Sequence, residues 1–434
     1  MSRQRNALAP SISGILIILA LGSLSAGEPG RATCAGPPPA VQPELSGAPD
    51  TVLVPSSWPW SKRIAESFLL RHPGAVTYDT GSPNPRWNYE QGLMLVALRA
   101  KWKASGDRRY FDFIKGNIDQ YVEESGSIKT YKYDDFNIDN VAVGRALLTL
   151  HEETGEAKYK RAADTLRKQL KNQPRTKEGG FWHKLIYPYQ MWLDGLFMGE
   201  PFYAWYAAQY HEPDAFDDIV NQFIFIARHT YDPKTGLYYH AWDESKQQRW
   251  ANPETGVSPH FWGRAIGWYA MAIVDVLDYI PMDHPRRKEL LPVLRKVCAG
   301  LLKHQDKKTH LWYQVLDQGR REGNYLEASA SCMFAYAFAK GANKGYLDKS
   351  YLAKAKAIFR GVTTHLVSID ASGFVDLHHT CQGAGLGGNP YRDGSYDYYI
   401  GERQRTNDMK GYGPFLLAAL ELEKNSTSKK RVKE

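Results

Sequence analysis

The chain of 434 residues lacks several motifs that would identify common chemistries. Its four cysteines, Cys34, Cys298, Cys332 and Cys381, are far apart and form no CxxC pair. Neither HExxH nor GxSxG occurs, which disfavours a zinc site and a serine-hydrolase elbow. The glycine-rich run GAGLGGNP (383–390) does not follow a clear strand and open a helix, so it is no dinucleotide fingerprint. We therefore expect no metal and no cofactor, and we interpret this run as a tight loop that can approach a ligand closely.

The chain also lacks a hydrophobic run long enough to span a bilayer. The longest candidate, residues 14–24, follows a charged start and precedes small residues suited to cleavage. Residues 1–26 therefore predict a signal peptide, and with it an exported protein that keeps no stable membrane anchor after cleavage. Residues 27–57 are rich in Pro, Gly and Ala and predict a flexible leader.

The net charge of +8 is modest and is not concentrated in a nucleic-acid motif. No helix rich in Arg and Lys with interleaved aromatic residues occurs, so we expect no nucleic-acid partner. Residues 425–434 carry several basic residues and predict a disordered tail. A basic protein is compatible with an anionic substrate, although this balance is also common in proteins without one.

Helical periodicity dominates the chain after Trp58. Segments that are apolar nearly all round alternate with amphipathic, charged segments, which is the pattern of helices buried inside and exposed outside. Gly or Pro marks most of the boundaries between them. The expected helices span 58–72, 88–104, 107–125, 139–154, 156–172, 194–210, 212–229, 262–280, 285–304, 326–341, 348–365 and 408–424.

Twelve helices joined in pairs predict one all-α domain over 58–424, an (α/α)6 barrel of six helical hairpins. An open solenoid is the alternative, but neither terminal pair resembles a polar cap. The long connections all lead from an outer helix to an inner one, so they must emerge at one end of the barrel. The starts of the inner helices should therefore gather Asp139, Asp194 and Arg264 around one pocket.

Asp194 is the most unusual of these residues, because it interrupts the apolar and aromatic run QMWLDGLFMGEPF (190–202). An ionised carboxylate is costly to bury without partners, and a carboxyl in such a setting is a candidate proton donor near neutral pH. Taken alone, Asp194 would more often be the cap of the following helix. Asp139, Arg264 and Asp408 lie at or just before the starts of similar segments, which favours a shared site instead.

The connections are rich in aromatic and polar residues, which suit the faces and rims of sugar rings. His183 and His240 have no second His or Cys at ligand spacing, which argues against a metal. Arg264 is either a structural guanidinium or a fork for a substrate carboxylate. With Trp268 one helical turn later, we favour the second interpretation.

Several motifs occur along the chain in a fixed order: FNIDN, QMWLDGLFM, YYHAWD and WGRAIGW, followed by YRDGSYDYYIGE and NDMKGYGPF. With these motifs in this order, the chain resembles the unsaturated rhamnogalacturonyl hydrolases, glycoside hydrolase family 105. The resemblance covers 58–424 and implies an (α/α)6 barrel. It also implies that the enzyme removes the unsaturated uronyl residue that polysaccharide lyases leave on an acidic oligosaccharide. In that family the C4–C5 double bond is hydrated, and the product then rearranges and expels the aglycone.

The resemblance also implies roles for individual residues. Asp194 matches the acid that protonates C4 and activates water for C5, and Asp139 matches a second carboxylate near the sugar ring. Ile266, where relatives often carry Asn, is a departure that affects subsite detail. The positions that match substrate-binding or pocket residues are Arg264, His240, Trp268, His183, Trp192 and Tyr89.

Three other functions are compatible with parts of this pattern. An unsaturated glucuronyl hydrolase for another polyanionic glycan would differ only in loops that bind the aglycone. A non-catalytic glycan-binding toroid would need the aromatic residues but no committed acid, and a polysaccharide lyase would create a double bond rather than remove one. The oligomeric state is left open.

Overall fold

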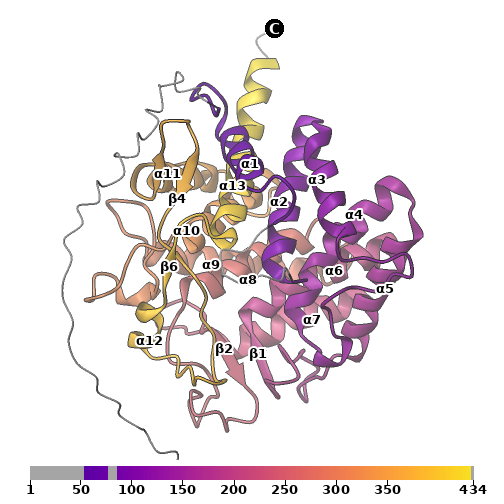
Figure 1. Ribbon diagram of the computed structural model, residues 1–434. Coiled ribbons are helices and arrows are strands. Elements are labelled where there is room, and N and C mark those ends of the chain that lie inside the picture. The colour runs from indigo at the N-terminus through magenta and orange to yellow at the C-terminus, as the bar shows by residue number, and fades with distance from the viewer. Residues whose placement is uncertain (1–52, 77–85, 432–434) are drawn as a thin grey trace, which may run out of the picture. The chain divides into compact units, whose positions relative to one another are not determined.

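Two concentric sets of helices make up the computed structural model of this protein, which describes residues 53–76 and 86–431 (Figure 1). All twelve expected helices are present, with ends that differ from the predicted ones by a few residues. The outer set comprises α1 (Trp60–Arg71), α3 (Arg108–Asp119), α5 (Ala157–Asn172), α7 (Ala215–Thr230), α9 (Arg287–Lys303) and α11 (Ser350–His365). The inner set comprises α2 (Tyr89–Ser105), α4 (Gly144–Thr154), α6 (Leu193–Gln209), α8 (Gly263–Val276), α10 (Ala328–Asn343) and α13 (Met409–Arg431).

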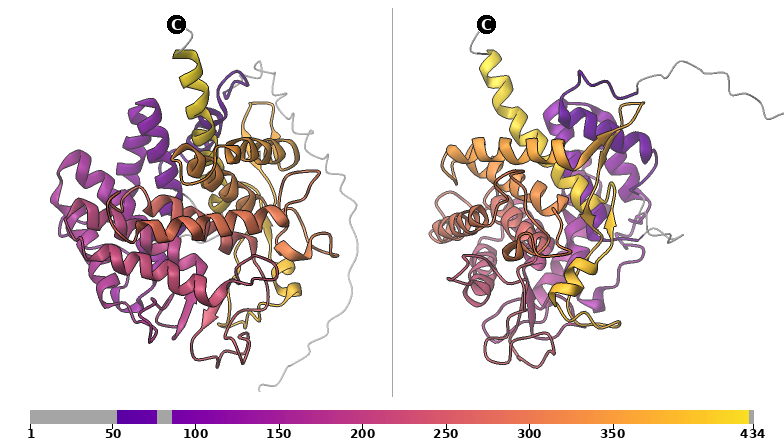
Figure 2. Two further views of the ribbon diagram at one scale, coloured as in Figure 1. Left: turned by 180° about the vertical axis from the view of Figure 1, so that it is seen from behind. Right: turned by 90° about the vertical axis from the view of Figure 1, so that its left-hand side faces the viewer.

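The division into inner and outer helices follows the sequence pattern. Every side chain of α8 is buried, whereas α5 buries one face and exposes the other. Each inner helix packs against the next, and α13 packs against both α10 and α2, so the inner ring closes. The (α/α)6 barrel is thereby confirmed, and the open solenoid is wrong. Figure 2 shows the two rings from two further directions.

The inner member of the second hairpin departs from a regular helix. It begins as a 3₁₀ segment, η2 (Ile138–Val143), which continues directly into α4. Asn137 caps this segment by accepting a hydrogen bond from the backbone N–H of Asp139 at 3.1 Å. The tighter turn fixes Asp139 at the very start of the inner element.

Short strands and turns within the long connections were not predicted from the sequence. Two further 3₁₀ turns, η1 (Tyr133–Asp135) and η3 (Leu316–Gln318), and a short helix, α12 (Tyr396–Gly401), also lie there. The strands form three antiparallel pairs: β1 (Gln190–Trp192) with β2 (Ala241–Asp243), β3 (Val367–Ile369) with β4 (Val375–Leu377), and β5 (Thr380–Cys381) with β6 (Gln404–Arg405). Two- and three-residue strands carry too little periodic signal to be read from sequence.

At both ends of the described chain, backbone structure extends beyond the predicted domain bounds of 58–424. Leu53 and Val54, assigned above to the flexible leader, donate backbone hydrogen bonds to Ser372 O, and Val54 is buried. The backbone of residues 425–431, assigned to a disordered tail, continues α13. The signal peptide and residues 27–52 of the leader fall outside the described residues. Among the residues that are described, no helix is both long and apolar enough to cross a membrane.

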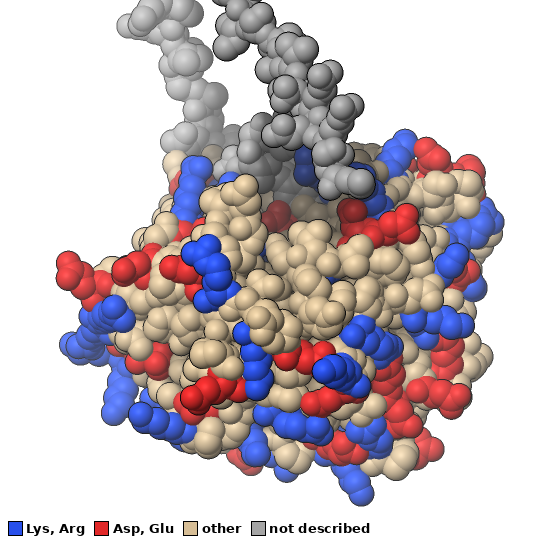
Figure 3. Space-filling model, turned by 90° about the horizontal axis from the view of Figure 1, so that it is seen from below, with Lys and Arg blue, Asp and Glu red and all other residues tan. Residues whose placement is uncertain are grey.

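Charges are mixed on the face seen from below Figure 1. Lys and Arg side chains there are interspersed with Asp and Glu rather than gathered by sign (Figure 3). On this face, attraction of an acidic ligand would come from local groups in a pocket, where the surrounding protein limits screening by solvent.

Candidate active site

A pocket of about 250 Å³ opens where the inner helices begin. Its walls bring together Asp139, Asp194 and Arg264, as expected from the repeat. Of the catalytic and substrate-binding residues proposed above, His240 alone does not line it. The lining residues are Tyr89, Asp139, His183, Lys184, Tyr187, Trp192, Asp194, Met198, Trp262, Arg264, Trp268, Gly383, Ala384, Arg392, Tyr398, Glu402 and Lys410.

Asp194 is held in the first turn of α6, immediately after β1. The helix is capped by Trp192 without a side-chain hydrogen bond, so Asp194 is not the cap. Its residue surface is 8 % exposed, and within the described part of the chain Oδ2 has no partner that meets hydrogen-bond geometry. Oδ2 is buried and lies 3.1 Å from Nε2 of His240, so a ligand in the pocket meets the exposed remainder of the carboxyl group.

His240 lies behind Asp194 because of strand pairing. The register of β1 and β2 sets Trp192 opposite Ala241, and Leu193 N donates to His240 O at 3.0 Å. The ring of His240 is fully buried, with Nε2 3.1 Å from Asp194 Oδ2. The predicted substrate-binding position is therefore a supporting one in this structure, because Asp194 separates His240 from the pocket.

Tyr399 fixes the other side of the His240 ring. Its hydroxyl lies 2.8 Å from Nδ1, and burial raises the pKa of Tyr399 well above its usual value, so the hydroxyl keeps its proton. When Asp194 is ionised, the arrangement without repulsion has Tyr399 donating to Nδ1 and the Nε2–H facing the carboxylate. Tyr399 and His240 thus orient Asp194.

We expect Tyr399→Phe to lower kcat about tenfold with little change in KM, because His240 loses the bond that selects its tautomer. Steady-state kinetics with the unsaturated substrate measures both constants. Tyr159→Phe is the matched control, since it removes a hydroxyl bonded to Asp119 outside the pocket. An equal loss in both variants would show that Tyr399 acts only through stability.

Asp139 is the second carboxylate of the pocket, and Lys184 and His183 hold it. Lys184 Nζ lies 2.5 Å from Oδ2, and His183 Nε2 lies 3.3 Å from Oδ1. Burial alone would raise the pKa of Asp139, but the charges of Lys184 and His183 and the hydrogen bond from Lys184 outweigh it and lower the pKa. Asp139 therefore stays ionised at neutral pH.

His183 is a buried neutral ring at the base of the pocket. Burial lowers its pKa to about 4, against the opposing effect of Asp139. The ring stacks on Trp192 with centroids 4.7 Å apart and planes 7° apart, and Trp192 stacks on Tyr187 at 5.0 Å and 13°. Three nearly parallel rings thus form one rigid wall beside the two carboxylates.

Gly195 lets this wall approach the start of α6. A Cβ at that position would lie 3.0 Å from Nδ1 of His183, closer than ordinary packing allows. Because His183 is stacked on Trp192, it cannot move aside without disturbing the wall. The Asp–Gly pair of the sequence therefore has a packing reason.

We expect Gly195→Ala to lower kcat/KM about tenfold because the added Cβ displaces the His183 ring, while the melting temperature changes little because this strain offsets the gain of about 1 kcal/mol that Ala has over Gly in a helix. Thermal unfolding and kinetics on the same preparation test this divergence. Gly116→Ala, in α3 with open space around its Cβ, is the control for the helix effect alone. Unchanged activity in Gly195→Ala would show that the ring wall tolerates displacement.

Arg264 is the most buried cation of the pocket. It is 0 % exposed, and its Nη2 donates to Cys381 O. Nε and Nη1 have no hydrogen-bond partner. A guanidinium does not deprotonate in proteins, so Arg264 presents a permanent charge with donors to spare, as a site for a carboxylate requires.

The remaining wall is formed by α2, α8 and the glycine-rich loop. Tyr89 meets Trp268 edge to face at 6.3 Å, and Trp268 stacks on Phe197 at 4.6 Å. Gly383 and Ala384 of the glycine-rich loop line the pocket, consistent with the close backbone approach expected of it. Ile266 is buried in α8 and does not line the pocket, so the departure at this position does not reach the site through direct contact.

Several pocket residues were not proposed from the sequence: Lys184, Tyr187, Met198, Trp262, Arg392, Tyr398, Glu402 and Lys410. Two of them could have been found from the sequence because they lie close to a residue already noted: Lys184 follows His183, and Lys410 lies two residues after Asp408. Asp408 itself does not line the pocket but holds Lys410 Nζ at 2.8 Å.

The described residues contain no group of three or more His, Cys, Asp or Glu side chains that could hold a metal ion. Cys298, Cys332 and Cys381 are buried and unpaired.

Comparison with known proteins places this site in a family. The model of Glycosyl Hydrolase Family 88 matches residues 60–426. A glycoside hydrolase of family 105 from C. acetobutylicum superposes with a TM-score of 0.81 and 46% identity, over 85% of this chain and 100% of that one. The unsaturated rhamnogalacturonyl hydrolase YesR of Bacillus subtilis is 30% identical over 62% of this chain and 74% of its own.

A third relative has no activity in its name. Protein Atu3128 of Agrobacterium fabrum is 40% identical over 52% of this chain and 97% of its own length. Because the family model spans nearly all of the barrel and YesR is matched over most of its length, the family is shown. The chain is a glycoside hydrolase that matches the Family 88 model and belongs to the unsaturated rhamnogalacturonyl hydrolases of glycoside hydrolase family 105.

Proposed function

We propose that this enzyme removes the unsaturated (4-deoxy-4,5-ene) uronyl residue from lyase-generated rhamnogalacturonan oligosaccharides. The observation that carries the proposal is the contrast between the two carboxyl groups of the pocket. Asp139 is held by Lys184 and stays ionised, whereas the only basic side chain among the described residues within ion-pair distance of Asp194 is the buried His240. Two carboxyls in different surroundings can take different roles in acid–base chemistry.

Asp194 is the group that can exchange a proton with the substrate. In the proposed reaction its carboxyl gives a proton to C4 of the enol ether, and positive charge develops at C5. The resulting carboxylate takes a proton from water as the water oxygen bonds to C5. The hemiketal then opens, and the bond to the aglycone breaks. A single carboxyl suffices because it is reprotonated in the same cycle.

Arg264 supports an acidic sugar as the substrate. Its unpaired donors face a site whose other cations are Lys184, Arg392 and Lys410, against the carboxylates of Asp139, Asp194 and Glu402. Lys410 is already paired with Asp408 and Glu90, so Arg264 is the cation whose donors are left for the carboxylate of a uronate. The stacked wall of Tyr187, Trp192 and His183 gives the sugar ring an apolar face.

The test is loss of ultraviolet absorbance of the conjugated double bond. Unsaturated rhamnogalacturonan disaccharide is compared with unsaturated disaccharides from glycosaminoglycans and from ulvan at equal concentration. We expect kcat/KM on the rhamnogalacturonan product to exceed the others at least tenfold. Preference for a glycosaminoglycan or ulvan product would instead identify an unsaturated glucuronyl hydrolase for another polyanionic glycan. An increase in absorbance on intact polysaccharide would indicate a lyase.

We further propose that the protein is exported, on the basis of the charged start, apolar run and small residues of 1–26. Expression of the full chain followed by fractionation and N-terminal sequencing tests this. The expected mature chain begins close to residue 27 and is found outside the cytoplasm. A full-length chain retained in the cytoplasm would contradict the proposal.

A further inference from the structure

A second cavity, of about 320 Å³, lies at the other end of the barrel. The first pocket is lined by the starts of the inner helices, and this one is lined by residues further along the same helices. Each inner helix contributes, as shown by Ala100, Arg145, Trp205, Asp275, Lys340 and Glu421. The proposed reaction uses none of these residues, so the far cavity requires its own explanation.

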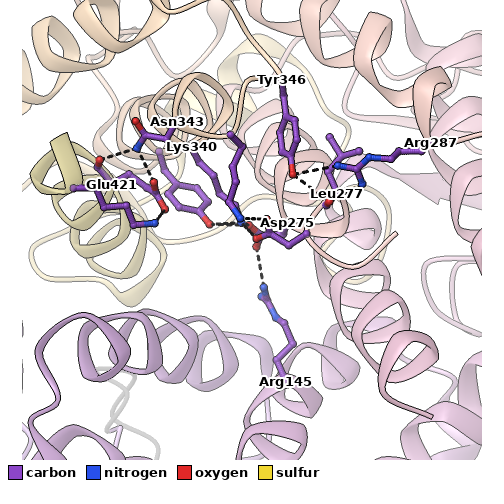
Figure 4. Close-up of polar contacts among 12 residues, drawn as sticks. Arg145, Asp275, Leu277, Arg287, Lys340, Asn343, Tyr346 and Glu421 are labelled. Carbon is purple, nitrogen blue, oxygen red and sulfur yellow. Dashed lines mark hydrogen bonds and ion pairs between the residues drawn. The ribbon is translucent and has the colours of Figure 1, made fainter. Parts of the chain in front are cut away.

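Arg145 of α4 is incompletely bonded in this cavity. The residue is 4 % exposed, and its Nη1 donates to Asp275 Oδ2 at 3.0 Å (Figure 4). Its Nε and Nη2 have no hydrogen-bond partner among the residues that the structure describes. Burying charged donors without acceptors costs free energy, so native structures rarely leave them unpaired. An acceptor that enters the cavity would satisfy them.

The charges around Arg145 do not balance. Lys340 Nζ lies 2.7 Å from Asp275 and 2.7 Å from Asp278, and Lys344 Nζ lies 2.9 Å from Asp278. Three cations, Arg145 included, therefore share two carboxylates. The cluster has an excess of one positive charge, and its members Arg145, Asp275 and Lys340 are buried whereas Lys344 is partly exposed.

The other cations of the cavity do not alter this balance. Arg99, Lys103 and Lys424 also line the cavity, and each has a carboxylate of its own. Their partners are Glu152, Glu153 and Glu421 respectively. One negative charge is thus the amount that would neutralise the site.

The rest of the cavity is apolar. Trp205 stacks on Tyr279 with centroids 5.4 Å apart and planes 11° apart, and Ala100, Leu417 and Leu420 complete the walls. The volume is at the lower end of the range of small-molecule sites. A ligand that fits has a compact apolar body and one anionic group.

We propose that the far cavity is a binding site for a small organic monoanion whose carboxylate pairs with Arg145. A planar carboxylate matches the guanidinium fork with two parallel hydrogen bonds, and its single charge matches the single excess charge. A dianion such as sulfate would overcompensate the cluster and leave the apolar walls uncovered. The site does not depend on the proposed sugar substrate.

Calorimetric titration of the purified enzyme with benzoate tests the proposal, with sulfate and chloride compared at constant ionic strength and neutral pH. We expect saturable 1:1 binding of benzoate and at least tenfold weaker binding of sulfate. Arg145→Gln should weaken benzoate at least tenfold. This variant keeps the partners of Asp275, because Lys340 and Tyr336 still bond to that carboxylate. Lys288→Gln, an exposed charge on α9, is the matched control and should bind benzoate as the wild type does.

A second variant keeps the test decisive if Arg145→Gln does not fold. Ala100→Phe places a ring in the cavity without removing any charge and should also abolish binding. Benzoate should also leave the KM for the unsaturated disaccharide unchanged. The ring of Phe197 lies between Arg145 and Trp268 of the active pocket and so separates the two cavities. Three results would overturn the proposal: no saturable binding of benzoate to the wild type, binding by Arg145→Gln and Ala100→Phe that equals binding by the wild type, or competition between benzoate and the substrate.

Discussion

Asp194→Asn is expected to reduce kcat/KM at least about a thousandfold, within the range of about 10²–10⁴ that a positioned acid–base group supplies. The amide cannot deliver a proton to C4 or accept one from water, yet it has the same shape and can still accept from His240 Nε2. The melting temperature should therefore change little. The assay follows ultraviolet absorbance on the unsaturated disaccharide, with KM measured separately.

Two comparisons make this result specific. Asp283→Asn, the same change at an exposed position between α8 and α9, should leave activity unaltered. Asp194→Asn should still bind the disaccharide in a calorimetric titration, because Arg264 and the ring wall remain. Activity within tenfold of the wild type would exclude Asp194 as the acid, and binding without turnover in the wild type would favour a glycan-binding toroid.

Asp139→Asn should be the second most damaging change, with kcat/KM reduced about a hundredfold or more. The substitution removes the negative charge that lies nearest Lys184 and leaves that ammonium facing a neutral amide. The pocket then gains net positive charge beside the sugar ring, where positive charge develops in the transition state. Kinetics and thermal unfolding on one preparation separate this effect from misfolding. Activity equal to the wild type would show that this carboxylate only holds Lys184.

Lys184→Met tests the electrostatic part of the same pair. Without the ammonium, burial of Asp139 is no longer offset, so the pKa of Asp139 rises and the acidic limb of the kcat/KM profile moves to higher pH. The contribution of this pair to stability depends on pH in the opposite direction to that of a protonated histidine paired with a carboxylate. The lowered pKa of Asp139 means that the pair stabilises the fold above the unfolded pKa of about 3.9 and loses its effect as the pH falls below it.

The difference in melting temperature between wild type and Lys184→Met should accordingly be present at pH 6–7 and shrink toward pH 3. A matched loss of the surface pair by Lys160→Met, which removes the contact with Asp164, should change stability by less than about 1 kcal/mol and leave the activity profile in place. An acidic limb that does not move in Lys184→Met would contradict the role of Lys184.

Local sequence predicted the helical architecture well, for a physical reason. A helix that is apolar all round can be stable only inside the ring, and a one-sided helix only outside it, so the alternation along the chain encodes the position of each helix. α8 and α5 illustrate the two kinds. The inner-to-outer connections are short, so all long loops lie at one end, which is why the sequence alone groups Asp139, Asp194 and Arg264.

The sequence alone therefore determined the barrel, the end that carries the site and the three charged residues at the starts of inner helices. Tertiary structure decided what those residues touch. His240 reaches Asp194 only because β1 pairs with β2 in one register, and Tyr399 reaches His240 across 159 residues. Such contacts depend on hydrogen-bond geometry between distant loops, which has no periodic trace in the sequence. The same holds for the far cavity, where Arg145 and Asp275 meet only because the ring closes.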